Sequence, residues 1–309
     1  MPTLPTYALI SPARDEALFI EQTIKAVISQ TYRPLKWVIV SDGSRDETDD
    51  IVQKYAVSNP WIELIRMPLR WERNFAGKAH AFNVGYAAVA NLQPDIVGNL
   101  DADVSFTEDH FRILASKFAK DPELGVGGAP FREGSRQYDY RYSNIENVWG
   151  GCQLFRRECF EDIGGYVPLR GGGIDYVAVI SARMKGWKTR TFTDTVCIHH
   201  RAMGTAQQGI LKAKFRLGVK DYSVGNSALW EAFRTCYQMS RRPFVVGALA
   251  MAGGYSWSLL RRAETSVSPE LRAFLRAEQM HRLGRFFHST LPSWPRKSKS
   301  SDINQLSAS

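Results

Sequence analysis

The sequence predicts an α/β fold, in which a doubly wound, mostly parallel sheet is followed by a helical and basic C-terminal extension. Over the first two hundred residues, short apolar runs alternate with segments whose apolar residues recur at helical spacing. Beyond them the charge balance changes sign: residues 1–200 carry a net charge of −2, whereas residues 201–290 carry +9. With 309 residues, of which 44% are apolar, the chain can bury a full core.

The apolar runs define four strands in the first hundred residues, each followed by a helix or a loop. We expect strands at 7–10, 35–40, 62–65 and 95–100, and helices at 19–28, around 51–55 and at 77–89. A later helix begins near residue 177, and a further strand is expected at 193–198. Because crossovers between parallel strands are right-handed, the loops that follow these strands gather at one edge of the sheet.

That edge carries carboxylates. Glu16 follows the first predicted strand, Asp42 the second, and Asp101 and Asp103 the fourth. Each of them alone is typical of a solvated loop, but four on one edge repel one another unless cations or ligand donors lie between them. Two aspartates at this spacing can share one hard divalent cation, which also bridges to phosphate oxygens. A nucleoside diphosphate with a metal ion would supply both, and Lys78 could neutralise the diphosphate.

Several motifs in register resemble one enzyme family. Residues 7–200 resemble a family 2 glycosyltransferase with the GT-A fold, through SPARDE, VIVSDGSRDET, GKAHAFNVG, NLDADV, GGCQLFRRECFEDIGGY and GIDYVAVISARMKGW. The resemblance implies a nucleotide-sugar donor, Mg2+ or Mn2+ as cofactor, and a glycan or lipid-linked sugar as acceptor. The sequence is similar to those of enzymes that make bacterial cell-surface polysaccharides, so exopolysaccharide or lipopolysaccharide synthesis is the expected setting.

The resemblance also assigns roles to individual residues. Asp103 would be the main metal ligand, and His199, after the last predicted strand, would either complete the metal site or be structural. Arg14 replaces an aromatic residue that is common in the family; its guanidinium can stack on a base in the same way. The donor would meet Pro12, Ala13, Arg14, Glu16, Asp42, Lys78, Asp101 and Ala102, and the acceptor would meet Gly150, Gly151 and Cys152.

Asp175 is the candidate general base. It follows the glycines at 171–173 and precedes a predicted helix, where an aspartate could also be a simple N-cap. The family often has an acidic pair here, and this sequence has Ile174 and Asp175. An acceptor hydroxyl needs a base to take its proton as the bond to the sugar forms. One base and a metal-supported leaving group predict a single displacement with inversion.

The C-terminal third predicts contact with an anionic partner. Residues 244–260 form an uncharged apolar stretch between two arginine pairs, which is short for a spanning helix and is interrupted by Gly253 and Gly254. We expect a helix, either continuous or broken at these glycines, at the interface of an anionic membrane, with Tyr255 and Trp257 at headgroup depth. The alternative is an internal packing helix. The predicted regions are 1–204 (catalytic), 205–290 (helical and basic) and 291–309 (disordered tail).

Other features bear on location and on competing functions. Residues 1–12 lack the pattern of a signal peptide, so we expect a cytoplasmic protein, peripheral at the inner face of the plasma membrane. The four cysteines show no metal-ligand spacing and are expected to be buried thiols. Two alternatives remain open: a basic non-catalytic protein that binds nucleotides or nucleic acid, and a nucleotidyltransferase on a similar sheet. The carboxylate edge argues against a nucleic acid partner.

Overall fold

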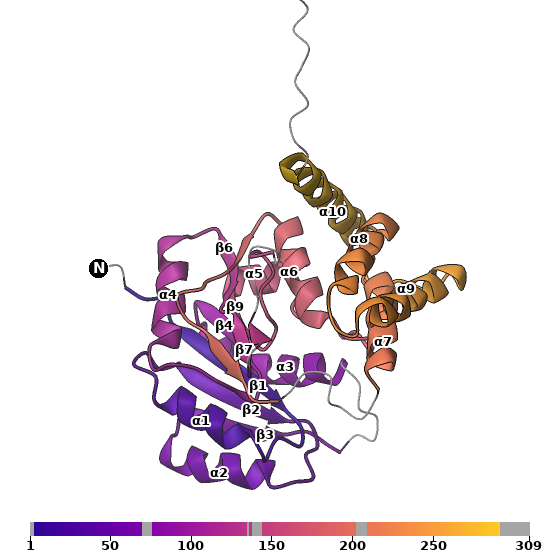
Figure 1. Cartoon of the computed structure of the whole chain (residues 1–309). Coiled ribbons are helices and arrows are strands. Elements are labelled where there is room, and N and C mark those ends of the chain that lie inside the picture. The colour runs from indigo at the N-terminus through magenta and orange to yellow at the C-terminus, as the bar shows by residue number, and fades with distance from the viewer. Residues whose placement is uncertain (1–2, 70–75, 135, 138–143, 202–208, 291–309) are drawn as a thin grey trace, which may run out of the picture.

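The computed structural model describes residues 3–69, 76–134, 136–137, 144–201 and 209–290 (Figure 1). Its centre is a seven-stranded sheet in the order β10-β6-β9-β4-β1-β2-β3, in which β9 alone runs antiparallel to its neighbours. The predicted mostly parallel, doubly wound sheet is therefore confirmed. The strands are β1 (Tyr7–Ala13), β2 (Lys36–Ser41), β3 (Ile62–Arg66), β4 (Ile96–Leu100), β6 (Leu124–Gly128), β9 (Cys152–Arg156) and β10 (Lys188–Thr191).

Helices cover both faces of this sheet because its strands are apolar on both sides. Leu9 and Trp37 point into one core with helices α1 (Ile20–Ile28), α2 (Thr48–Ser58) and α4 (His110–Lys120). Their neighbours Ala8 and Val38 point into the opposite core. That second core is formed with α3 (Ala76–Val89), which runs into a short 3-10 turn at Ala90–Leu92, and with α5 (Arg157–Asp162) and α6 (Ile174–Met184). Near-continuous burial of this kind is what buried parallel strands require.

A second, small sheet lies beside the central one. It is formed by β5 (Val104–Ser105), β11 (Cys197–His199), β7 (Phe131–Glu133) and β8 (Arg136–Gln137), in that order. The strand predicted at 193–198 is found only as Cys197–His199, so its predicted start is wrong, because residues 193–195 form a turn and a bend. Asp194 pairs with Lys117 at 2.8 Å, and the Thr195 hydroxyl lies 2.9 Å from His110, so side-chain contacts hold this segment out of the ladder. His199 is consequently within a strand and not beyond it.

Four helices form the C-terminal part of the chain: α7 (Ile210–Ser223), α8 (Ala228–Met239), α9 (Phe244–Leu260) and α10 (Pro269–Thr290). The expected interruption at Gly253 and Gly254 is absent, since α9 runs unbroken through both. Gly254 instead lets α9 approach α7, because a side chain there would meet the Phe215 carbonyl. Among the described residues, no helix is long and apolar enough to cross a bilayer.

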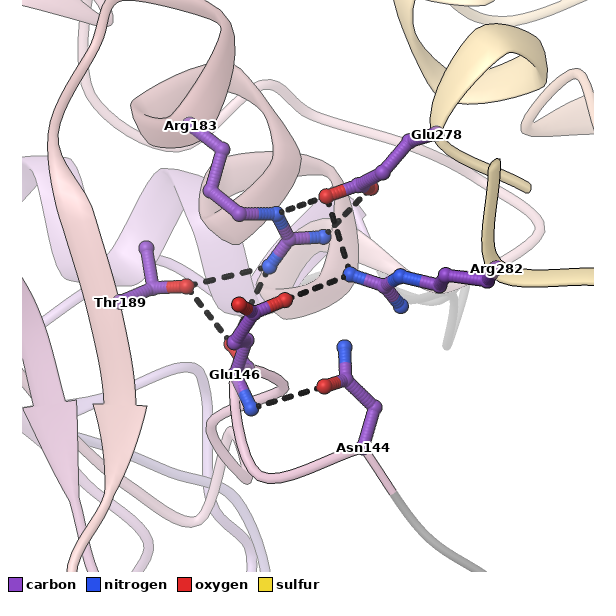
Figure 2. A network of polar contacts seen from close by, with 6 residues as sticks. All are labelled: Asn144, Glu146, Arg183, Thr189, Glu278 and Arg282. Carbon is purple, nitrogen blue, oxygen red and sulfur yellow. Dashed lines mark hydrogen bonds and ion pairs between the residues drawn. The ribbon is translucent and has the colours of Figure 1, made fainter. Parts of the chain in front are cut away.

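An arginine–glutamate network fixes α10 to α6 and to Glu146 (Figure 2). Arg183, near the end of α6, binds Glu278 of α10 through Nε at 2.7 Å and through a second nitrogen at 3.0 Å. Arg282 bridges Glu278 and Glu146, at 2.9 Å from each. The Arg183 side chain is only 9% exposed, and a two-point, partly buried pair of this kind is stronger than an exposed one. This network therefore anchors the C-terminal end of α6, whose other end carries Asp175.

Candidate functional site

The carboxyl ends of β1, β2 and β4 form the floor of the candidate site. Pro12 and Ala13 are the last two residues of β1, and the Asp42 amide donates to the Ala13 carbonyl at 2.8 Å. The loop after β1 is fastened to the start of α2, because the Glu16 amide donates to the Thr48 hydroxyl at 2.8 Å. The Asp101 amide, after β4, donates to the Gly151 carbonyl at 2.8 Å. Backbone pairing thus brings the predicted donor loops to one edge.

Basic side chains balance the carboxylates at this edge. Arg14 lies 3.9 Å from Asp42, and both side chains are largely buried. Glu16 is ion-paired with Arg201, a residue from the segment after β11. These arginines therefore offset the expected repulsion among the carboxylates within the protein. A ligand bound at this edge would replace them with groups of its own as partners of the carboxylates.

Lys78 and Asp101 form a further ion pair of the site. Lys78, in the first turn of α3, is ion-paired with Asp101 and lies 3.5 Å from the Gly150 carbonyl. Burial favours a neutral lysine, but the charges of Asp101, Asp175 and Asp103 outweigh it, so the pKa of Lys78 is raised. Burial also raises the pKa of Asp101, with Asp103 adding to the effect and Lys78 opposing it. Lys78 therefore remains a fixed positive charge among three carboxylates.

Asp103 and His199 lie together at the boundary of the two sheets. Asp103 Oδ2 is 3.4 Å from His199 Nε2, and the two side chains are only 10% and 9% exposed. On the other side, His199 Nδ1 lies 3.7 Å from a Glu133 carboxylate oxygen. Burial works against charge on both groups, yet their mutual attraction prevails, so the pKa of His199 is raised and that of Asp103 is lowered.

This arrangement fits a divalent cation. One carboxylate oxygen and one imidazole nitrogen converge on the same space, and imidazole with carboxylate is a donor set that Mn2+ accepts. The Glu133–His199 contact matches the outer carboxylate that commonly orients a histidine ligand. Arg201 Nε also lies 3.4 Å from Asp103 Oδ2, so a cation would take over part of the charge balance that Arg201 now supplies.

Asp175 faces the same space from α6. It is the second residue of that helix, and the N-cap position belongs to Gly173, whose φ of 89° suits glycine. A Cβ atom added at Gly150 would lie 2.5 Å from both Cβ and a carboxylate oxygen of Asp175. Gly150 thus lets its backbone lie against the Asp175 side chain, while its carbonyl accepts hydrogen bonds from Asn99 and Lys78.

The remaining predicted residues contribute through their backbone. A side chain at Gly151 would collide with the ring of Trp149, so this position is small for packing reasons. Ala102 is 4% exposed, and Cys152 is fully buried against His110. Only their main-chain atoms are therefore available to a ligand at this edge.

Sequence reasoning missed four residues of the site. Asn99 is a buried polar side chain in an apolar strand, and this contrast was a usable signal. Arg201 directly follows His199 and His200, so its position was also a usable signal. Glu133 belongs to a segment without any motif, and only the folding of the second sheet against the first brings it here. Trp149, whose ring lies 5.6 Å from that of His199, directly precedes the predicted Gly150, and this position was a usable signal.

Comparison with known proteins gives the family of this chain. The family model described as "Glycosyl transferase family 2" matches residues 8–164. A probable glycosyltransferase of Bacillus subtilis, YdaM, is 28% identical over 153 residues, which are 48% of this chain and 35% of the relative. Poly-beta-1,6-N-acetyl-D-glucosamine synthase of Staphylococcus aureus is 32% identical over 117 residues, 38% of this chain and 26% of the relative. The chain thus matches about a third or less of the length of these relatives.

Solved structures agree on the fold. A mannosyltransferase from Pyrobaculum calidifontis, in complex with GDP-Man and Mn2+, superposes with a TM-score of 0.55 at 20% identity, covering 93% of this chain and 81% of that one. TarS of S. aureus, residues 1–349 in complex with UDP-GlcNAc, has a TM-score of 0.54 at 14% identity, covering 93% and 82%. The sequence motifs, the sheet and these similarities agree: the chain belongs to glycosyl transferase family 2 and has the GT-A fold.

Proposed function

We propose that this protein is an inverting, metal-dependent glycosyltransferase that moves a sugar from a nucleoside-diphosphate donor to a hydroxyl of a glycan or lipid-linked acceptor. One observation carries the proposal: the Asp175 side chain lies against Gly150, whose carbonyl contacts Lys78, the partner of Asp101. A candidate base and candidate phosphate-side groups therefore share one small space. The neighbours that contain GDP-Man, UDP-GlcNAc and Mn2+ support such a donor, and the S. aureus synthase supports a role in polysaccharide synthesis.

Each residue then has a defined task. Asp103 and His199 would hold Mg2+ or Mn2+, and the bound ion supplies charge stabilisation to the departing diphosphate. Lys78 adds a fixed positive charge on the same side. Asp175 accepts the proton of the acceptor hydroxyl while that oxygen bonds to the anomeric carbon and the bond to the diphosphate breaks. A single displacement of this kind inverts the anomeric centre.

The donor is identified by a hydrolysis and transfer screen. Purified protein is incubated with Mn2+ and a panel of UDP-, GDP- and dTDP-sugars, and nucleoside diphosphate release is measured with and without candidate acceptors. The proposal expects one donor to be turned over only with the metal present. Thermal stabilisation by oligonucleotides, with no response to any sugar nucleotide, would favour the alternative of a nucleic-acid-binding protein.

We further propose that α9 docks this protein on an anionic membrane, which would place it at the inner face of the plasma membrane. One face of α9 packs inside the protein, through Ala248, Met251 and Tyr255. The other face leaves six apolar side chains in water, with exposed fractions of 48% to 81%: Val245, Val246, Leu249, Trp257, Leu259 and Leu260. Contiguous exposed apolar surface commonly marks an interaction site.

Arginines at both ends of α9 select a negatively charged partner. Arg241 and Arg242 precede the helix, and Arg261 and Arg262 follow it. Each cation near an anionic leaflet contributes about 1 kcal/mol, so four of them suffice for reversible attachment. The expected headgroup position of Tyr255 is wrong, because this residue is 5% exposed and its hydroxyl donates to the Asn226 carbonyl at 2.8 Å. Trp257, on the exposed face, retains that expected role.

Flotation with vesicles tests this docking. The protein should float with vesicles that contain anionic lipid and less with neutral ones, and raising the salt should weaken binding. Replacing the four arginines by serine should remove most of the dependence on anionic lipid. Replacing the four surface arginines and lysines of another region, Lys36, Lys54, Arg66 and Lys25, is the matched control. Equal flotation of both variants would contradict the proposal.

A further inference from the structure

A second group of metal-binding side chains lies below the site, in the protein interior. It consists of His110 at the start of α4, Cys152 at the start of β9 and Cys197 at the start of β11, each with no exposed surface. His110 Nε2 is 3.4 Å from Cys152 Sγ and 3.8 Å from Cys197 Sγ. All three atoms lie within 4.8 Å of one another. Residues far apart in sequence thus place two sulfurs and one nitrogen around a common point.

Hydrogen bonds link the three side chains, including one between Cys152 and Cys197. His110 Nδ1 is occupied by the Thr195 hydroxyl at 2.9 Å, which leaves Nε2 to face both sulfurs. A neutral imidazole nitrogen has either one lone pair or one N–H, so it makes one good hydrogen bond, not two. A contact from the far nitrogen that fixes the tautomer is also what metal-ligating histidines show. A cation shared by all three atoms satisfies Nε2 and both sulfurs together.

We propose that His110, Cys152 and Cys197 bind a thiolate-preferring d10 cation, Zn2+ or Cu+. Ideal tetrahedral bonds to zinc separate a nitrogen and a sulfur ligand by about 3.6 Å, and the two measured separations, 3.4 and 3.8 Å, lie on either side of this value. Cu+ accepts two sulfurs and one nitrogen directly, whereas Zn2+ adds a solvent molecule as fourth ligand. Zn2+ binding expels both thiol protons, and the two thiolates neutralise the ion, so the buried zinc complex is uncharged. With Cu+, loss of one thiol proton gives an uncharged complex, and loss of both leaves one negative charge.

The site would join α4 to two segments that carry proposed glycosyltransferase residues. Cys152 directly follows Gly150 and Gly151, and Cys197 stands two residues before His199 on β11. An ion between them holds the small sheet against the central sheet. The inference rests on the geometry of these three side chains and does not depend on the proposed transferase activity.

Metal content of the full chain is the direct test. The protein is purified under reducing conditions without chelator, from medium supplied with Zn2+ or with Cu2+, and its metals are measured by mass spectrometry. We expect about one Zn2+ or Cu+ per chain. The Asp103→Ala variant, in which the other candidate metal site is disabled, should retain this ion in the presence of excess Mg2+. Selective retention of one ion identifies which of the two the site takes. Cys152→Ser and Cys197→Ser should each lose it, whereas Cys159→Ala, a change at a buried cysteine outside the cluster, should keep it.

A spectroscopic measurement covers the case in which the serine variants fail to fold. Wild-type chain loaded with Co2+ should show intense thiolate-to-cobalt absorption, and modification of the thiols should release the ion stoichiometrically. Wild-type protein that stays metal-free after loading with both ions overturns the proposal. So does equal metal loss in Cys159→Ala, or a disulfide between Cys152 and Cys197 in freshly purified protein.

Discussion

The sheet edge and helix α9 differ in which side chains they expose to water. At the edge, charged side chains are withdrawn from solvent in pairs: Asp103 is 10% exposed beside His199, and Arg14 is 14% exposed beside Asp42. On α9, Leu249 and Leu260 stay in water at 61% and 81%. Burying paired charges is costly, and so is exposing apolar surface. The stability of this chain alone therefore does not explain either arrangement. The sheet edge suits a charged ligand, whereas the exposed face of α9 suits an apolar one.

The largest effect is expected at Asp175. Asp175→Asn keeps the shape of the side chain but removes the base, so transfer should fall by about 100- to 10,000-fold. Donor affinity should stay within a few-fold, because the donor diphosphate is assigned to Asp103, His199 and Lys78, whereas Asp175 is assigned to the acceptor hydroxyl. Steady-state transfer and calorimetric donor binding measure the two quantities separately. Transfer within tenfold of wild type would place the base elsewhere.

The metal pair should give the next largest effect. Asp103→Ala removes the carboxylate between His199 and Arg201. We expect Mn2+ affinity to fall by more than about 100-fold, because even outer partners of a metal ligand contribute about 10- to 100-fold. Glu133→Gln, which changes only such an outer partner, is the graded comparison and should cost less. Titration of Mn2+ with UDP or GDP present measures both, and unchanged affinity in Asp103→Ala would exclude it as a ligand.

Two neighbouring glycines of α9 have different surroundings: Gly254 lies on the side packed against α7, and Gly253 lies on the open side. Gly254→Ala pushes a methyl group against the Phe215 carbonyl of α7 and should destabilise the fold by about 1 to 3 kcal/mol. At Gly253 a methyl group would meet only the Phe215 ring, at 4.0 Å. Gly253→Ala should therefore stabilise the helix by about 0.5 to 1 kcal/mol. Urea denaturation compares the two variants, and equal effects would mean that α9 does not pack tightly on α7.

The smallest effect is a dependence on pH. Asp103 raises the pKa of His199 above its usual 6.5, so the charged pair stabilises the metal-free fold at low pH and this contribution disappears as pH rises through that pKa. Only the neutral imidazole binds metal. Mn2+ affinity should therefore rise about tenfold per pH unit up to the His199 pKa and level off above it. In His199→Gln this slope should vanish, and a wild-type profile without a slope would remove His199 from the metal site.

The sequence by itself determined four of the seven strands of the central sheet and the edge at which they end. Alternating strand and helix periods specified β1 to β4 to within three residues at each end, because a strand buried on both faces must be apolar throughout. The positions of Asp42, Asp101 and Asp103 at the ends of strands followed from the same pattern. These features depend on local order along the chain, which a sequence displays directly.

Tertiary structure alone decided which side chains meet across long separations. Arg201 reaches Glu16, Glu133 reaches His199, and Cys197 joins Cys152 and His110, although no spacing in the sequence relates them. The same holds for α9: its apolar composition was plain, but only packing against α7 showed that Tyr255 is buried and Trp257 exposed. Composition sets how much apolar surface a segment has, whereas the neighbours that fold against it set which part of that surface meets water.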